Sequence, residues 1–244
     1  MEVRNIVLVH GAWADGSSWN QVIKPLQADG FQVTSVQIPL RSLEADVAAV
    51  RQVLAVQDGP TVVAGHSYGG AVVTQLGPDA ANVTGLVFVS AFVPDEGESM
   101  KALVTSGPPP AGSAAIRPDS RGLIWLDRAG FIEFFAPDID PDDARVLAAV
   151  QQPISADALL GDTRFGPPAW KTFPSWFVVS EEDQMLPPAA QLAMAGRAGS
   201  IVTAISGSHV TLISHAPEVA RVIAAAARAV SSIAIRTGSG GARV

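Results

Sequence analysis

Cysteine is missing from this sequence, and its absence removes several classes of chemistry at once. None of the 244 residues is cysteine, so a disulfide framework, a thiolate metal site and a cysteine nucleophile are excluded. Charge is also scarce, because only 16% of the residues are charged and acidic residues outnumber basic ones by 23 to 16. The resulting formal charge of −7 argues against a nucleic-acid-binding surface. Histidine-dependent chemistry has only four candidates, at positions 10, 66, 209 and 215.

Long apolar runs are missing as well. The run at residues 6–9 is too short for the hydrophobic region of a secretory signal. The stretch 59–78 contains no Asp, Glu, Lys or Arg, but glycine, proline and histidine interrupt it and it does not resemble a membrane span. We therefore expect a cytoplasmic protein with no membrane partner. Hydrophobic residues nevertheless make up 48% of the chain, which is typical of a chain that folds around a large core.

Short apolar runs alternate along the chain with longer amphipathic stretches. The runs are rich in valine and isoleucine, as in parallel strands that are covered on both faces. This alternation predicts an α/β fold with a mostly parallel, doubly wound sheet. Strands are expected at 3–9, 32–38, 61–64, 86–90, 176–180 and 201–205, and helices at 17–28, 43–56, 67–76, 188–197 and 217–232. Ligands of such sheets bind beyond the carboxyl ends of the strands, so catalytic residues are expected there.

Residues 94–174 do not follow this alternation of strands and helices. Prolines and glycines recur, no good strand is visible, and two helical patterns stand out, around 121–135 and 141–152. We predict a helical cap inserted over the strand ends, with 1–93 and 175–236 as the core and 237–244 as a flexible tail. Aromatic side chains of the cap that could line a substrate pocket are Trp125, Phe131, Phe134 and Phe135. Each of them could instead serve only to hold the cap on the core.

The sharpest motif is Gly65-His66-Ser67-Tyr68-Gly69-Gly70, directly after one predicted strand and at the start of a helix. A serine in a tight strand-to-helix turn has a strained backbone, and side chains two residues away on either side would collide with neighbouring elements. Glycine at those positions therefore predicts a nucleophile elbow with Ser67 as the nucleophile. The turn also leaves the first N–H groups of the helix, including that of Tyr68, free to bind an oxyanion.

A serine hydroxyl becomes a useful nucleophile only when a base removes its proton. His209 follows the last predicted strand, at the same edge of the sheet as Ser67, and is the predicted base; His215 is a rival six residues later. The base in turn needs a carboxylate that orients it. Asp183, just after the next-to-last predicted strand, is the predicted acid, and the region of Asp95 is the alternative.

A second oxyanion donor is expected where the first strand ends. That strand leads into His10-Gly11-Ala12-Trp13, and the glycine permits a sharp turn that aims the Ala12 N–H inward. We predict Ala12 and Tyr68 as the donors of an oxyanion hole, each contributing about 3 kcal/mol to transition-state stabilisation. Trp13 is a candidate for the pocket lining, and His10 is interpreted as a structural hydrogen-bonding residue.

Together these segments resemble the α/β-hydrolase superfamily. Within it, the chain is similar to small single-cap esterases related to plant methylesterases, salicylate-binding esterases, hydroxynitrile lyases and bacterial pyrethroid hydrolases. The resemblance is carried by residues 7–13, 65–70, 91–95, 178–187 and 208–209. It implies the α/β-hydrolase fold, with Ser67 as nucleophile, Asp183 and His209 as its partners, and Ala12 and Tyr68 as the oxyanion donors.

The resemblance also helps to distinguish an esterase from a hydroxynitrile lyase. Hydroxynitrile lyases of this group carry a threonine after the strand-end histidine and a lysine after the catalytic histidine, where this chain has Gly11 and Val210. Without that cation, cyanide lacks a counter-charge in a dry pocket. We therefore predict a serine esterase, with neither metal nor cofactor, for small to medium apolar carboxylic esters, as a monomer or homodimer. Cleavage of lactone, amide or C–C bonds, and small-molecule binding without turnover, are the alternatives.

Overall fold

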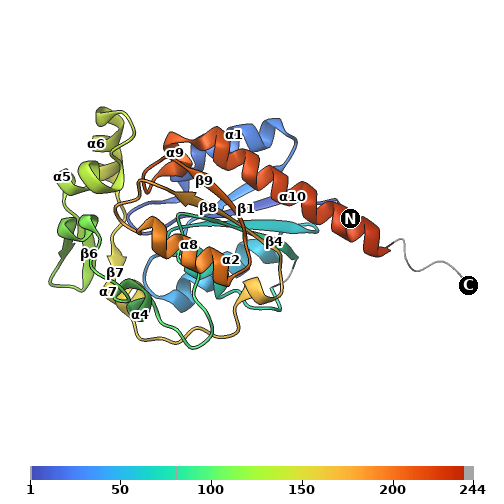
Figure 1. Ribbon diagram of the computed structural model, residues 1–244, viewed down its shortest axis with the longest axis horizontal. Helices are drawn as coiled ribbons and strands as arrows, with labels where there is room; N and C mark the ends of the chain where they lie inside the picture. The colour runs from blue at the N-terminus through green and yellow to red at the C-terminus, as the bar shows by residue number, and fades with distance from the viewer. Residues whose placement is uncertain (1, 81, 239–244) are drawn as a thin grey trace, which may run out of the picture.

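A six-stranded parallel sheet forms the centre of the molecule (Figure 1). The computed structural model describes residues 2–80 and 82–238. The strand order is β2-β1-β3-β4-β8-β9, and each neighbouring pair is parallel. These strands are β1 (Asn5–Val9), β2 (Gln32–Val36), β3 (Thr61–His66), β4 (Val83–Val89), β8 (Ser175–Ser180) and β9 (Ile201–Ile205). The predicted α/β fold is confirmed, and each of the six expected strands is present.

Burial explains why the apolar runs form these strands. All residues of β1, β3 and β8 are buried, because helices cover both faces of the sheet. The edge strands β2 and β9 each pair with a single neighbour, and most of their residues are exposed or half-buried. The parallel arrangement brings the carboxyl ends of the strands to one rim, where the loops that carry the candidate catalytic residues begin.

Helices pack on the two faces of the sheet (Figure 1). One face carries α1 (Asn20–Ala28) and α10 (Ala216–Gly238), which contact each other, and the opposite face carries α2 (Leu43–Ala55), α3 (Tyr68–Thr74) and α8 (Pro188–Arg197). The short helices η1 (Gly16–Trp19) and α9 (Thr211–Ser214) precede α1 and α10. Within the residues described, no helix combines the length and the hydropathy needed to cross a bilayer. Of the tail predicted at 237–244, residues 239–244 lie outside the described residues.

The insertion between β4 and β8 contains strands as well as helices. Its antiparallel sheet has the order β5-β6-β7, with β5 (Ile116–Pro118), β6 (Leu123–Leu126) and β7 (Ile154–Ser155). Its helices are α4 (Met100–Val104), α5 (Arg128–Gly130), α6 (Pro141–Val150) and α7 (Ala156–Leu160). Single turns are η2 (Ala111–Ala115), the π-helical η3 (Phe131–Phe135) and η4 (Ala169–Lys171). We use the word cap for residues 94–174.

The small sheet differs from the helical pattern expected at 121–135, and the reason is local. Residues 123–126 alternate between half-buried and buried positions, which is the two-residue period of a strand. Gly122 adopts a φ of +77°, which closes the hairpin turn between β5 and β6 with a backbone conformation that only glycine adopts without strain. Helix α5 begins at Arg128, and Asp127 caps its N-terminus because the Asp127 carboxylate accepts a hydrogen bond from the Gly130 N–H.

Candidate active site

The turn between β3 and α3 has the geometry of a nucleophile elbow. Ser67 adopts φ +53° and ψ −123°, a conformation that an L-residue occupies only at an energetic cost. The flanking glycines permit it. A Cβ on Gly65 would lie 2.6 Å from the Gly69 carbonyl oxygen, and one on Gly69 would lie 2.5 Å from the His10 carbonyl oxygen. The backbone packing at this turn therefore excludes any side chain at these two positions.

Three side chains from distant parts of the chain form a hydrogen-bonded row at the rim of the sheet. The Nε2 atom of His209 lies 2.8 Å from the Oγ of Ser67, and its Nδ1 lies 2.7 Å from the Oδ2 of Asp183. A carboxylate only accepts hydrogen bonds, so Nδ1–H donates to Asp183 and Nε2 is left to accept the serine proton. Each of the three residues is at least 95% buried. The structure thus brings together the residues predicted as nucleophile, base and acid.

The Asp183 carboxylate is held by more than His209. Its Oδ1 accepts the backbone N–H groups of Met185 and Leu186, each at 2.8 Å. Its Oδ2 also accepts a hydrogen bond from the side-chain amide of Gln191, at 2.8 Å. Gln191 is fully buried on α8, and sequence reasoning missed it. These donors fix the orientation of the Asp183 carboxylate toward His209.

The other acid and base candidates lie elsewhere. The Asp95 carboxylate pairs with Lys171 at 2.6 Å, and this partner lowers the pKa of Asp95 below its usual value. The Nδ1 of His215 contacts the Ser214 hydroxyl at 2.9 Å. Neither residue has a hydrogen bond to Ser67 or His209 among the described residues.

Two further histidines surround the site without joining the row. His66 donates through Nε2 to the His209 carbonyl oxygen, at 2.8 Å. Burial, reinforced by the neighbouring His209, holds the pKa of His66 well below its ordinary value. His10 donates through Nδ1 to the Gly11 carbonyl oxygen and accepts the Ile38 N–H at Nε2, and burial lowers its pKa too. Both rings are therefore neutral hydrogen-bonding groups that support neighbouring backbone.

The residue after the nucleophile is anchored by a buried carboxyl group. The Tyr68 hydroxyl donates to Oδ2 of Asp46 at 2.7 Å, and Oδ1 of Asp46 accepts the Leu40 N–H at 2.7 Å. Asp46 lies on α2 and is fully buried. Burial raises its pKa to about 6. Sequence reasoning missed this contact, whose only signal is an acidic residue in the first turn of an amphipathic helix.

A cavity of about 550 Å³ opens directly at Ser67. Most of its wall comes from three parts of the chain: residues 12–13, the cap segment 103–110, and residues 185–187 and 189–190 at the start of α8. Phe92, Ser113, Ile116 and Leu159 complete it. His209 is the sole ionisable side chain among the described residues that line it. Trp13, predicted as a lining residue, and Ala12, predicted as an oxyanion donor, both border this cavity. The large contribution of residues 103–110, with three consecutive prolines, was not predicted.

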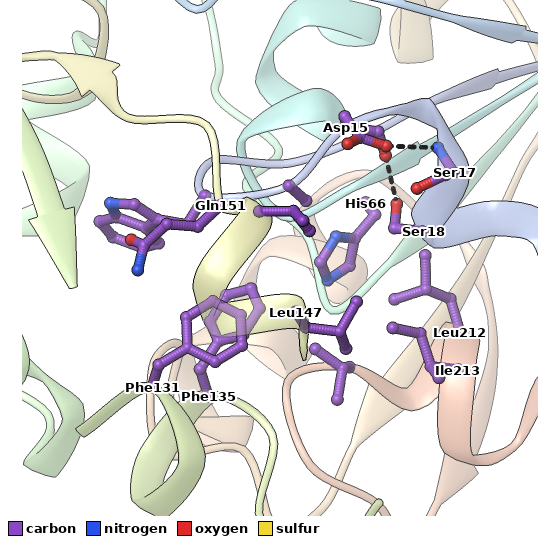
Figure 2. A pocket seen from close by; sticks show the side chains of 14 residues that line it. Asp15, Ser17, Ser18, His66, Phe131, Phe135, Leu147, Gln151, Leu212 and Ile213 are labelled. Carbon is purple, nitrogen blue, oxygen red and sulfur yellow. Dashed lines mark hydrogen bonds between the residues drawn. The ribbon is translucent and has the colours of Figure 1, made fainter. Parts of the chain in front are cut away.

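The aromatic residues of the cap lie behind the site and not in the cavity. Phe131 and Phe135 line a separate hollow, where Figure 2 shows them beside Leu147 and across from His66. The ring of Phe135 packs against that of His209, with the centroids 5.1 Å apart. Neither these two residues nor the other two predicted aromatics line the cavity at Ser67: Trp125 donates to the Asp119 carboxylate within the cap, and Phe134 packs near Gly112. The predicted lining is therefore corrected at these four positions: Phe135 packs against His209 of the core, whereas Trp125 and Phe134 make contacts inside the cap.

Comparison with known proteins agrees with this geometry. The sequence pattern described as "Alpha/beta hydrolase family" matches residues 6–222. The chain belongs to this family. The resemblance noted from the motifs is thereby confirmed.

Two curated relatives match part of the chain. A carbendazim-hydrolysing esterase from Nocardioides sp. (strain SG-4G) is 32% identical over 45% of this chain and 51% of its own length. A pyrethroid hydrolase from Sphingobium wenxiniae is 28% identical over 46% of this chain and 45% of its own length. The matched regions thus span about half the length of these relatives.

Solved structures match almost the whole chain. A pyrethroid hydrolase from Sphingobium faniae JZ-2 superposes with a TM-score of 0.77 at 24% identity, covering 93% of this chain and 98% of that one. Polyneuridine aldehyde esterase superposes with a TM-score of 0.77 at 18% identity, covering 91% and 98%. At these identities the likeness concerns the fold, including the cap, and does not extend to the substrate.

Proposed function

We propose that this protein is a serine carboxylesterase that acts on apolar carboxylic esters. The observation that carries the proposal is the hydrogen-bonded row of Ser67, His209 and Asp183 at the floor of an apolar cavity. The relatives named as esterases and hydrolases support the same reaction class. Among the described residues that line the cavity there is neither lysine nor arginine, which suits a neutral ester and leaves cyanide without the counter-charge of a lysine.

The contacts support the following reaction. Ser67 Oγ attacks the ester carbonyl carbon while its proton passes to Nε2 of His209. The bond to the alcohol oxygen then breaks, and His209 returns the proton to the leaving alcohol. Water next attacks the acyl group on Ser67 and gives a proton to His209, which protonates Ser67 Oγ as the carboxylic acid leaves. Asp183 keeps the Nδ1–H of His209 in place and stabilises the imidazolium in both steps.

The developing oxyanion is stabilised by backbone N–H groups. Ala12 borders the cavity at Ser67, and Tyr68 is the first residue of α3, whose N–H has no partner inside that helix. We propose these two N–H groups as the donors. The hydrogen bond from the Tyr68 hydroxyl to Asp46 fixes the side chain of this residue and thereby the start of α3.

Rapid-mixing kinetics with a p-nitrophenyl ester test the proposal. The wild-type protein should release a burst of p-nitrophenol equal to the enzyme concentration before the steady state, because the acyl-enzyme accumulates. Ser67→Ala should abolish both the burst and the turnover. Ser120→Ala, at an exposed serine in the β5–β6 turn, is the control and should behave as wild type. Turnover by Ser67→Ala at the wild-type rate would exclude the proposed mechanism.

A further inference from the structure

The loop that carries His209 is held from outside by the cap. Asp138 lies between η3 and α6, 70 residues before Ser208 in the chain. Its Oδ2 accepts the backbone N–H of Ser208 and the hydroxyl of Ser214, each at 2.8 Å. Its Oδ1 accepts the hydroxyl of Ser208 at 2.6 Å. Three donors from the core therefore converge on one carboxylate of the cap.

These bonds constrain the backbone on both sides of His209. Ser208 immediately precedes His209, and both its N–H and its hydroxyl donate to Asp138. The Ser208 hydroxyl also accepts the N–H of Val210, at 3.2 Å. The ring of Phe135, from the same part of the cap, packs against the imidazole of His209. The cap thus adds contacts to the loop and to the ring of His209.

The loop gains limited support from the sheet itself. It follows β9, an edge strand that pairs only with β8, and four of the five residues of β9 are exposed or half-buried. The loop is bonded to the segment after β8, where the Glu182 N–H donates to the Gly207 carbonyl oxygen at 3.0 Å, and His66 donates to the His209 carbonyl oxygen. Asp138 adds the hydrogen bonds that come from the cap. A displacement of the base by about 1 Å can cost 100-fold in rate, so a further contact next to His209 bears on catalysis.

Asp138 is not among the residues that line the cavity at Ser67, so it acts through the loop and not on a bound ester. We infer that Asp138 is a positioning residue for His209, and that the cap contributes to catalysis by holding the base as well as by shaping the cavity. The inference rests on the proposed role of His209 as the general base.

Steady-state kinetics with the p-nitrophenyl ester test the inference. Asp138→Ala should lower kcat between about 10- and 100-fold and leave KM nearly unchanged, since the cavity wall and Ser67 stay in place. Asp138→Asn keeps one acceptor oxygen and should recover part of the lost kcat. The matched control is Glu133→Ala, which removes an exposed carboxylate from the same part of the cap and should retain the wild-type kcat.

A double-mutant cycle tests the route of the effect. If Asp138 acts through Ser208, then Asp138→Ala should reduce kcat by a smaller factor in a Ser208→Ala background than in the wild type. Equal factors in both backgrounds would overturn the inference, as would a wild-type kcat for Asp138→Ala. If Asp138→Ala does not fold, the same double-mutant cycle is measured with Asp138→Asn in the wild-type and Ser208→Ala backgrounds.

Proton NMR gives a readout that does not depend on turnover. The proton between His209 Nδ1 and Asp183 Oδ2 should give a downfield resonance that shifts or broadens in Asp138→Ala and stays unchanged in Glu133→Ala. An unchanged resonance in Asp138→Ala would overturn the positioning role alone. A wild-type protein that neither hydrolyses esters nor reacts with a fluorophosphonate would instead overturn the proposed function, and the resonance would still decide whether Asp138 positions His209.

Discussion

The core and the cap of this molecule position their side chains in different ways. In the core, the three residues of the hydrogen-bonded row each follow a strand of one parallel sheet, so the backbone delivers them to the same rim. In the cap, short elements are held by side-chain contacts, such as the packing of Phe135 against Trp13, with the ring centroids 6.1 Å apart. The core therefore supplies the proposed chemistry, whereas the cap supplies the cavity wall and the outer support of the base.

The largest effect is expected from a core residue. Asp183→Asn should keep the fold but lower kcat by about 10⁴-fold, because the amide favours the wrong tautomer of His209. Glu181→Gln, two residues earlier and exposed, is the control and should leave kcat unchanged. Steady-state kinetics on the same ester measure both. A loss of less than about 10-fold for Asp183→Asn would contradict the role that we propose for this carboxylate.

The second prediction compares the effects of substituting two cap residues, Phe131 and Leu103, on stability and on acyl preference. Phe131 is 1% exposed behind the site, so Phe131→Ala should lower the free energy of unfolding by about 3–5 kcal/mol without changing the preference for acyl length. Leu103 borders the cavity, so Leu103→Ala should shift that preference toward bulkier acyl groups at little cost in stability. Denaturant unfolding and kcat/KM over a series of esters measure the two effects.

The reverse result would break the distinction between the two regions of the cap. If Phe131→Ala changed acyl preference and Leu103→Ala did not, the aromatic cluster would belong to the substrate site after all.

The smallest effect is expected from the buried carboxyl of Asp46. Its pKa of about 6 in the folded protein lies above the ordinary value of 3.8, so between these pH values the folded state binds a proton that the unfolded state has lost. This contribution to stability is complete below pH 4 and is lost as the pH rises through 6, by up to about 3 kcal/mol. Asp46→Asn removes it, so the variant should gain stability relative to wild type between pH 4.5 and 7.5. Denaturant unfolding of both proteins at pH 4.5 and pH 7.5 measures the change. The same difference in stability between wild type and Asp46→Asn at both pH values would contradict the prediction.

The features that could be predicted from the sequence are those that depend on residues close together in the chain. The strand at 61–66 and the elbow at Ser67 could be recognised because the apolar run and the glycines are adjacent in the chain. The end of a parallel strand also fixes where the next loop begins, which is why His209 and Asp183 could be predicted to meet Ser67. The prediction that Ser67, His209 and Asp183 lie together therefore depended only on local sequence patterns and on one rule of sheet topology.

The remaining features depend on contacts between distant residues. Asp138 meets Ser208 across 70 positions, and Asp46 meets Tyr68 across 22. Each is an acidic residue in a polar or amphipathic stretch, which by composition alone is typical of a solvated surface. The cap aromatics were assigned to a pocket because of their type, but whether a ring faces a cavity or a packed interface is decided by the tertiary packing around it.

The activation of Ser67 by His209 is tested most directly by the reaction of the protein with a fluorophosphonate, followed by peptide mapping. We predict one phosphonylated residue, Ser67, with labelling abolished in Ser67→Ala and strongly slowed in His209→Ala, because the hydroxyl reacts only when the imidazole removes its proton. Labelling of a different serine, or equal rates of labelling in wild type and His209→Ala, would contradict this activation.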